Sequence, residues 1–160
     1  MPTITRDFTV AVFVVHAGHV ILHRHPKLGL WLPPGGHIEP NELPDEAALR
    51  EVREETGLAI VLHEERGLPV DYPDQARQLI RPAGIQLESI SPGHEHIDLV
   101  YFATLRDHTA DAPLPELFEG MMWVAQANLS THELLDEVRA WCDRALGQPD
   151  ADSIASTSTR

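Results

Sequence analysis

Three glutamates within one helical turn, Glu51, Glu54 and Glu55, are the residues of this sequence best suited to chemistry. If residues 44–56 wind at about 100° per residue, Glu55 lies about 40° and Glu54 about 60° from Glu51 around the helix axis. Carboxylates this close repel one another, and near the C-terminal end of a helix they also face the negative end of its dipole. A hard divalent cation such as Mg²⁺, which prefers oxygen ligands, would compensate that repulsion.

The same glutamates also permit a simpler interpretation, a solvated acidic face on an ordinary surface helix. Arg50 and Glu54 are four residues apart and would then form an ion pair worth about 0.3 kcal/mol. The helix alone does not choose between the two interpretations, so the surrounding spacing has to decide. The side expected to pack on a core carries Ala48, Leu49, Val52 and Thr56.

Local patterns predict where this helix begins and ends. Pro44 suits the first helical position, because proline lacks the N–H that would be unpaired there. Asp45 and Glu46 place negative charge at the positive end of the helix dipole. Gly57 sits where a left-handed cap would end the helix. The helix is therefore predicted over residues 44–56.

Apolar runs between turn signals predict the other elements. Residues 8–24 are predicted as a β-hairpin, and residues 26–36 mostly as loop. Ser130 and Glu133 fit a capping box, which predicts a helix from there to about Leu146. Further strands are predicted at 58–62, 85–90, 97–105 and 121–125. This order of strands and helices indicates a mixed α/β domain with helices packed on a curved sheet.

Length and composition bound the class of protein. The chain has 160 residues, so we expect one domain over 1–147 followed by a polar, disordered tail over 148–160. The net charge of -13 argues against nucleic-acid binding through a basic surface and against docking on anionic lipid. The single cysteine, Cys142, excludes an internal disulfide and a Cys-rich zinc site. The apolar run 10–15 is too short to span a bilayer and no cleavage pattern follows it, so a cytoplasmic location is expected.

The spacing around the predicted helix decides between its two interpretations. Gly36 is followed by five residues, Glu42, seven residues, and then Arg50-Glu51-Val52-Arg53-Glu54-Glu55-Thr56-Gly57-Leu58. This run resembles the Nudix box, and every specified position of that motif matches. The resemblance implies an α/β/α sandwich around a mixed, curved sheet. It also implies divalent-metal-dependent hydrolysis, with Mg²⁺ or Mn²⁺, of a nucleoside diphosphate linked to another group, X.

The resemblance also implies roles for individual residues. Glu51 and Glu55 would be the principal metal ligands, and Glu54 a further ligand or the group that positions water. The backbone carbonyl of Gly35 is a further candidate ligand. Arg50 would hold the glutamates in place. Two residues, Glu42 and Gly57, would be structural.

Other residues are candidates for a general base or for substrate contacts. Some members of the family take the base from the box and others from a later loop. We favour Glu119 slightly for the later loop, with Glu116 and Glu95 as alternatives. Arg24, at the end of a predicted strand, and Gly36 are candidate substrate contacts. An ordinary structural or solvating role is an equally good interpretation of Glu119 and of Arg24.

The histidines are weaker signals than the glutamates. His94 and His96 alternate along a strand and would share one side of it. Two histidines without a third ligand do not define a zinc site. We therefore interpret them as solvated or core-edge side chains.

Two alternatives to a hydrolase share the same fold. A nucleotide-binding regulator is one, but such relatives often lose box glutamates and this chain keeps all of them. An isoprenyl-diphosphate isomerase is the other, and it needs a catalytic cysteine near the metal, whereas Cys142 falls in the predicted last helix. The partner is expected to be a small nucleotide-type molecule. The sequence leaves open X, the base, the number and identity of the metal ions, the phosphorus attacked and the oligomeric state.

Overall fold

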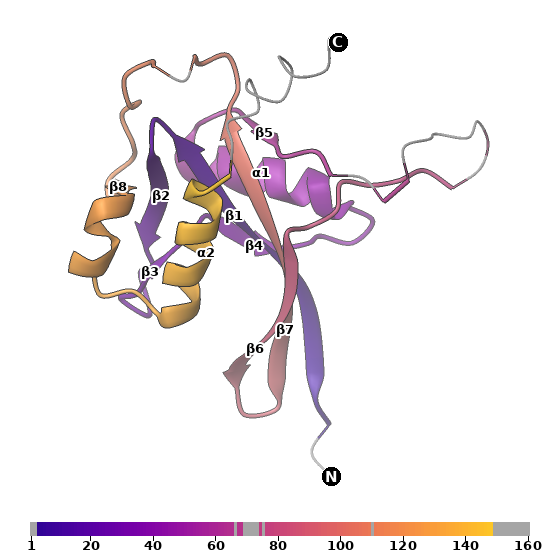
Figure 1. The fold of residues 1–160 in the computed structure, drawn as a ribbon. Helices are drawn as coiled ribbons and strands as arrows, with labels where there is room; N and C mark the ends of the chain where they lie inside the picture. The colour runs from indigo at the N-terminus through magenta and orange to yellow at the C-terminus, as the bar shows by residue number, and fades with distance from the viewer. Residues whose placement is uncertain (1–2, 66, 69–73, 75, 110, 149–160) are drawn as a thin grey trace.

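The computed structural model describes residues 3–65, 67–68, 74, 76–109 and 111–148. An eight-stranded mixed sheet lies between two helices, α1 on one face and α2 on the other (Figure 1). The α/β/α sandwich expected from the resemblance is therefore confirmed. The helices are α1 (Pro44–Thr56), α2 (Asp136–Leu146) and the short 3₁₀ helix η1 (Gln126–Thr131). The strands are β1 (Thr5–His16), β2 (His19–Arg24), β3 (Trp31–Leu32), β4 (Gly35–His37), β5 (Ile60–Leu62), β6 (Gly84–Ser91), β7 (His94–Leu105) and β8 (Met121–Ala125).

Strand β1 is shared among several partners, and this arrangement positions the box. Along one edge β1 pairs in parallel with β7, from Thr5 opposite His94 to Val15 opposite Thr104. Antiparallel partners meet it at two different levels, β2 near His16 and β4 near Val10. The chain therefore leaves β1 through β2 and β3, and returns to its middle as β4, immediately before the box.

Alternation along β1 divides the core between the two faces. Val10, Val12 and Val14 are buried in the cluster that contains α1. Phe13 and Val15 are buried in the cluster that contains α2. Phe8 belongs to the predicted buried strand but is 56% exposed, because it precedes the part of β1 that the helices cover.

Helix α1 has the predicted bounds, with Pro44 at its start and Gly57 as a left-handed cap at φ 72°. The backbone N–H of Leu43 donates to the side chain of Glu46, which supports the first turn. The expected core face is confirmed at Ala48, Val52 and Thr56. It is wrong at Leu49, which is 38% exposed, whereas Ala47 is buried. The covered stripe is thus turned by a fraction of a helical turn from the predicted one.

Residues 26–36 are mostly loop, as predicted, with the two short strands β3 and β4 at their end. The predicted start of the last helix is wrong. The last helix begins at Asp136 rather than at Ser130. Residues Leu134 and Leu135 pack against the core, and Leu135 is extended at ψ 146°, so the chain turns there before helix begins.

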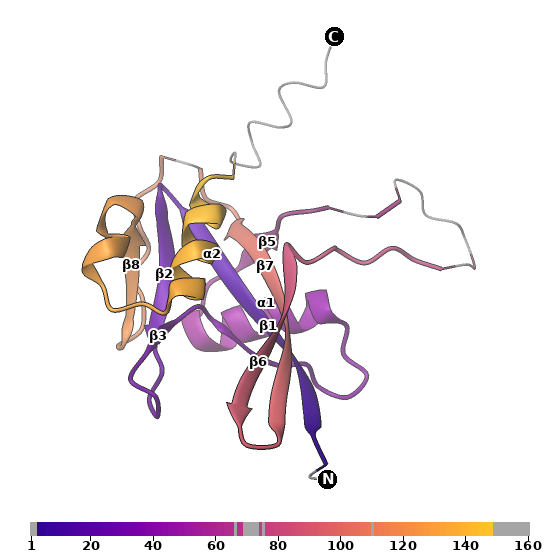
Figure 2. The same cartoon turned by 60° about the horizontal axis from the view of Figure 1, so that its bottom comes forward.

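The first residues of β1 and the β6–β7 hairpin project from the body as a ribbon (Figure 2). Ile85 and Leu87 of β6 are 66% and 59% exposed. The two faces of this ribbon carry different chemistry, because alternate residues point to opposite sides.

Neither described helix has the length and apolarity that crossing a membrane requires. The predicted tail begins at residue 148, and residues 149–160 lie outside the described part of the chain. A single domain over 1–147 and a cytoplasmic location stay predictions.

Replacing Val52 with alanine tests how much the α1–sheet contact contributes to stability. Val52 is fully buried, so losing two methyl groups and leaving a cavity should lower the free energy of unfolding by about 2 kcal/mol. Leu49→Ala on the same helix is the control, and although it removes more atoms it should cost less than half as much. Urea unfolding of the three proteins measures both values. A larger loss in Leu49→Ala would contradict the observed orientation of α1.

Candidate active site

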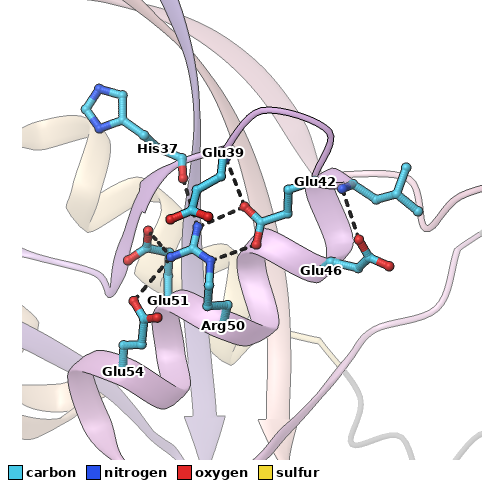
Figure 3. Close-up of polar contacts among 8 residues, drawn as sticks. His37, Glu39, Glu42, Glu46, Arg50, Glu51 and Glu54 are labelled. Carbon is cyan, nitrogen blue, oxygen red and sulfur yellow. Dashed lines mark hydrogen bonds and ion pairs between the residues drawn. The ribbon is translucent and has the colours of Figure 1, made fainter.

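The guanidinium of Arg50 binds four groups of the box at once (Figure 3). Its Nε and Nη2 donate to the two carboxylate oxygens of Glu42 at 2.7 and 2.9 Å. Its Nη1 donates to Glu51 at 2.8 Å and to Glu54 at 3.2 Å. Its Nη2 also donates to the carbonyl of His37 at 3.0 Å. One cation therefore draws together three carboxylates and the strand that precedes the box.

This ion pairing changes the acidity of its members. Hydrogen bonding to Glu42 and Glu51 raises the pKa of Arg50 further above its ordinary range. The hydrogen bond from Arg50 lowers the pKa of Glu42. Glu42 also accepts the backbone N–H of Glu39 at 2.9 Å. It thus fixes the loop before α1 to the middle of the helix.

Two glycines allow Glu51 and Glu55 to approach the backbone of β4. The Gly35 N–H donates to Oε2 of Glu55 at 3.0 Å. A Cβ on Gly36 would lie 2.5–2.8 Å from the carboxylate of Glu51, closer than atoms pack. Gly35 is just as restricted, since its Cβ would lie 2.1 Å from the carbonyl oxygen of Val10. The glycine pair therefore places two carboxylates against one short stretch of strand.

Glu55 differs from its neighbours in its environment. It is half-buried, and burial raises its pKa, with a further contribution from the charge of Glu51; the Gly35 N–H opposes the shift. Glu54 is exposed on the outer side of α1. Carboxylate oxygens and a nearby backbone carbonyl are the donors that Mg²⁺ and Mn²⁺ prefer. Glu51, Glu54, Glu55 and Gly35 are thus the residues able to hold such an ion.

A cavity of about 290 Å³ begins at this site and extends under α2. Gly35, Gly36 and Glu55 line its end nearest the box, and Phe13, Leu32 and Trp141 supply apolar surface. Its polar lining includes Thr9, His23, His25, His37, Gln86, Glu88, His96, Asp98 and Glu137. The cavity therefore joins Glu55 on the α1 side to a chamber on the α2 side that has both apolar and polar walls.

Hydrogen bonds order one wall of this cavity. Trp141 Nε1 donates to Gln86 at 2.8 Å, and the Gln86 amide donates to Asp98 at 3.4 Å. The Thr9 hydroxyl donates to the other oxygen of Asp98 at 3.0 Å. Burial raises the pKa of Asp98, and burial followed by the charge of Asp98 raises the pKa of Glu88.

Sequence analysis missed this wall. A carboxylate within the apolar run of β7 was the available signal for Asp98. Nothing local connects Gln86 with Trp141, which is 55 positions away.

The remaining candidates take different positions. Arg24 ends β2 and is exposed; its backbone N–H donates to the carbonyl of Gly120 at 2.8 Å, and its Nε donates to Gly29 at 3.4 Å. Glu119, next to Gly120, is also exposed. The loop that carries it reaches the end of α1, because a Cβ on Gly57 would lie 2.9 Å from the ring of Phe118.

Of the two alternatives to Glu119, Glu116 is exposed in the same loop. Glu95 pairs instead with Arg6 at 2.8 Å on the projecting ribbon.

Comparison with known proteins identifies the family. Residues 5–144 match the family described as NUDIX domain. A crystal structure of a NUDIX family hydrolase from Clostridium perfringens superposes with a TM-score of 0.71 and 36% identity, covering 89% of this chain and 97% of that one. The chain therefore belongs to the Nudix hydrolase family.

Curated relatives match over shorter regions. The m7GpppN-mRNA hydrolase NUDT17 of Xenopus laevis is 45% identical over 60 residues, 34% of this chain and 20% of that protein. A putative 8-oxo-dGTP diphosphatase of Bacillus subtilis is 34% identical over 64 residues, 38% of this chain and 43% of that protein. This chain thus spans less than half the length of either relative.

Replacing Glu42 with glutamine tests the ion pair with Arg50. Losing a charge-assisted, bidentate contact should lower the free energy of unfolding by about 1–2 kcal/mol at about pH 7. The pKa of Glu42 is lower in the folded protein than in the unfolded chain. The contribution of its charge is therefore fully present above the unfolded value of 4.5 and is lost as the pH falls through the folded value.

Urea unfolding at about pH 7 and about pH 3 should show the difference between Glu42→Gln and wild type shrinking in acid. Glu133→Gln, which changes an exposed glutamate outside the box, is the control and should match wild type at both values. An undiminished difference in acid would show that the charge of Glu42 is not what stabilises the loop.

Proposed function

We propose that this protein hydrolyses a phosphoanhydride bond in a nucleoside diphosphate linked to another group, using a divalent metal ion at the box. One observation carries the proposal: Glu51 and Glu55 are both held against the Gly35–Gly36 backbone, and Glu55 and both glycines line a cavity of about 290 Å³. The carboxylates suit a cation, and the cavity has room for the organic part of a substrate. The names of the two curated relatives, an mRNA cap hydrolase and an 8-oxo-dGTP diphosphatase, agree with a nucleotide substrate.

Glu51 and Glu55 are the principal ligands in this proposal, with the Gly35 carbonyl beside them. Val12 donates to Pro34 and Ile38 donates to Phe8, so the alternating β1–β4 ladder leaves both polar groups of Gly35 directed away from β1. Its N–H reaches Glu55 there, and its carbonyl faces the same edge. A bound Mg²⁺ or Mn²⁺ ion neutralises the diphosphate and acidifies the attacking water.

The other box residues position these groups or move a proton. Arg50 holds Glu51 and Glu54 and is itself fixed by Glu42. Glu54 is exposed and lies within one helical turn of both ligands, so we assign it the proton of the attacking water or the positioning of that water. Glu119 is the alternative base, because its loop packs on the end of α1 through Phe118.

The substrate is expected to lie across both parts of the site. Its diphosphate would lie over Gly36, whose missing side chain leaves the backbone open, and Arg24 would contact a phosphate from the end of β2. Its nucleoside end would enter the cavity, where Trp141 and Leu32 supply apolar contact and Gln86 and Asp98 supply polar contact. Because protein and substrate are both negatively charged, they need a bridging cation to associate.

The position of Cys142 does not support an isomerase. Cys142 is fully buried on α2, on the face of the sheet opposite α1, and burial raises its pKa to about 12. It is therefore a packed thiol at neutral pH rather than a nucleophile or an acid beside the box.

Glutamine at position 51 or 55 should abolish turnover while the fold survives. Each change removes a carboxylate ligand, and losing several kcal/mol of metal-derived stabilisation corresponds to a fall in kcat/KM of about 100-fold or more. Glu46→Gln is the matched control on the same helix, because glutamine still accepts the N–H of Leu43. The assay uses nucleoside triphosphates, nucleotide sugars, ADP-ribose and dinucleoside polyphosphates with Mg²⁺ and with Mn²⁺, and identifies both products.

Activity within a few-fold of wild type in both Glu51→Gln and Glu55→Gln would reject the proposal. Nucleotide binding by calorimetry without any product would instead favour the regulator. Full activity after removal of divalent ions with a chelator would reject the role given to the metal.

The general base can be assigned by comparing Glu54→Gln with Glu119→Gln. We expect Glu54→Gln to lower kcat by about 100-fold or more, because a general base contributes at least that much, and Glu119→Gln to lower it only a few-fold. The pH dependence of kcat should lose its acidic limb only in Glu54→Gln. The opposite result would move the base to the loop before β8.

A further inference from the structure

Three histidines and an aspartate gather where β1, β4 and β7 meet, outside the box carboxylates. Asp7 lies opposite His96 in the β1–β7 register, and His37 lies opposite Thr9 in the β1–β4 register. His94 is two residues before His96. Because alternate residues of a strand point to one side, all four side chains lie on the face of the sheet that carries α2. Figure 3 shows the ring of His37 directed away from Arg50.

Three of these four side chains, Asp7, His37 and His96, lie close enough to share an ion, and His94 joins them through Asp7. Oδ2 of Asp7 lies 3.6 Å from Nε2 of His37 and 3.6 Å from Nε2 of His94. One ligand atom from each of Asp7, His37 and His96 lies within 4.8 Å of the other two. Separations of 3.6 Å exceed a hydrogen bond. Tetrahedral zinc with bonds of about 2.0–2.1 Å separates its ligands by about 3.3 Å, so small side-chain rotations would complete a site.

A neighbouring threonine orients one of the imidazoles. The Thr5 hydroxyl donates to the carbonyl of Gly93 and lies 2.9 Å from Nδ1 of His94. This contact fixes the ring of His94, whose Nε2 lies 3.6 Å from Oδ2 of Asp7. A cation between these two atoms would stabilise the arrangement. Metal-bound histidines commonly have their second nitrogen fixed in this way.

The third imidazole, that of His96, faces both of the other two rings. The ring of His96 lies 4.9 Å from that of His37 and 5.2 Å from that of His94. A proton links only one imidazole to the carboxylate, whereas a divalent ion contacts every group. Arg6 does not compensate Asp7 from within the cluster, because it points to the opposite side of β1 and pairs with Glu95.

We propose that Asp7, His37 and His96 bind one Zn²⁺-like transition-metal ion at a site separate from the box carboxylates, with His94, 3.6 Å from Asp7, as the fourth ligand after a side-chain rotation. Imidazole ligands select ions such as Zn²⁺ and Co²⁺, whereas the all-oxygen box suits Mg²⁺. The ion links β4, which pairs with β1 over only three residues, to β1 and β7. The bound ion therefore fixes β4, the strand that carries Gly35 and Gly36, to the rest of the sheet.

Calorimetric titration of the full chain with Zn²⁺ in excess Mg²⁺ tests this site directly. We expect one Zn²⁺ per chain, with affinity reduced at least about tenfold in His96→Gln and in Asp7→Asn. Thr5→Val keeps all four ligands and should reduce affinity about tenfold by releasing the ring of His94. His108→Gln is the matched control, because His108 also lies beside a second histidine, His16, at a ring distance of 5.7 Å. The Zn²⁺ affinity of this variant should equal that of wild type.

Visible absorption of the Co²⁺-loaded protein provides a second measurement. Four-coordinate Co²⁺ absorbs strongly and six-coordinate Co²⁺ weakly, so an intense band that is lost in Asp7→Asn places the ion in the cluster. Asp7 is exposed, so this variant stays informative if His96→Gln does not fold. Absence of Zn²⁺ binding in excess Mg²⁺ would overturn the proposal. Zn²⁺ binding that is unchanged in Asp7→Asn and His96→Gln would overturn it as well, because the ion would then belong to the box.

Discussion

The close placement of carboxylates on α1 is the constraint on which the rest of the site depends. Glu42, Glu51 and Glu54 each direct an oxygen to Arg50, which makes their proximity tolerable within the protein itself. The same guanidinium holds the His37 carbonyl, so one set of hydrogen bonds both compensates charge and positions β4. Glu55 stands apart from this set. It accepts the N–H of Gly35 instead, and burial raises its pKa.

The pairing of the strands brings the carboxylates on one face of the sheet next to the cavity on the other face. Because β1 pairs with β2 near one end and with β4 in its middle, the chain returns to the sheet immediately before α1. The absence of a side chain at Gly36 then lets the Glu51 carboxylate meet the strand, and that at Gly35 lets β4 lie close to β1. The cavity opens on the other face, under α2. The carboxylates of α1 and the cavity under α2 thus lie on opposite faces of one sheet and meet at β4.

The box could be read from the sequence because its signals are local. Pro44, Gly57 and the spacing of the glutamates fix α1 within a few neighbouring residues, and the structure has the predicted bounds. The rest depends on tertiary contacts. Leu134 and Leu135 pack on the core and delay the last helix, although Ser130 and Glu133 match a capping box. The cavity wall joins Gln86 to Trp141, and the histidine cluster joins residues of three strands, so neither leaves a periodic signal in the chain.

Residue His37 of strand β4 makes two separate sets of contacts. The carbonyl of His37 is bound by Arg50, while its imidazole lies beside Asp7 and His96. One residue therefore contacts both the carboxylate cluster around Arg50 and the histidine cluster. If an ion bound at one of these clusters changes the affinity of the other cluster for its ion, thermodynamic linkage requires that the second ion change the affinity for the first by the same factor. In this fold the binding of two ions of different chemical hardness would thus be coupled through the single residue His37.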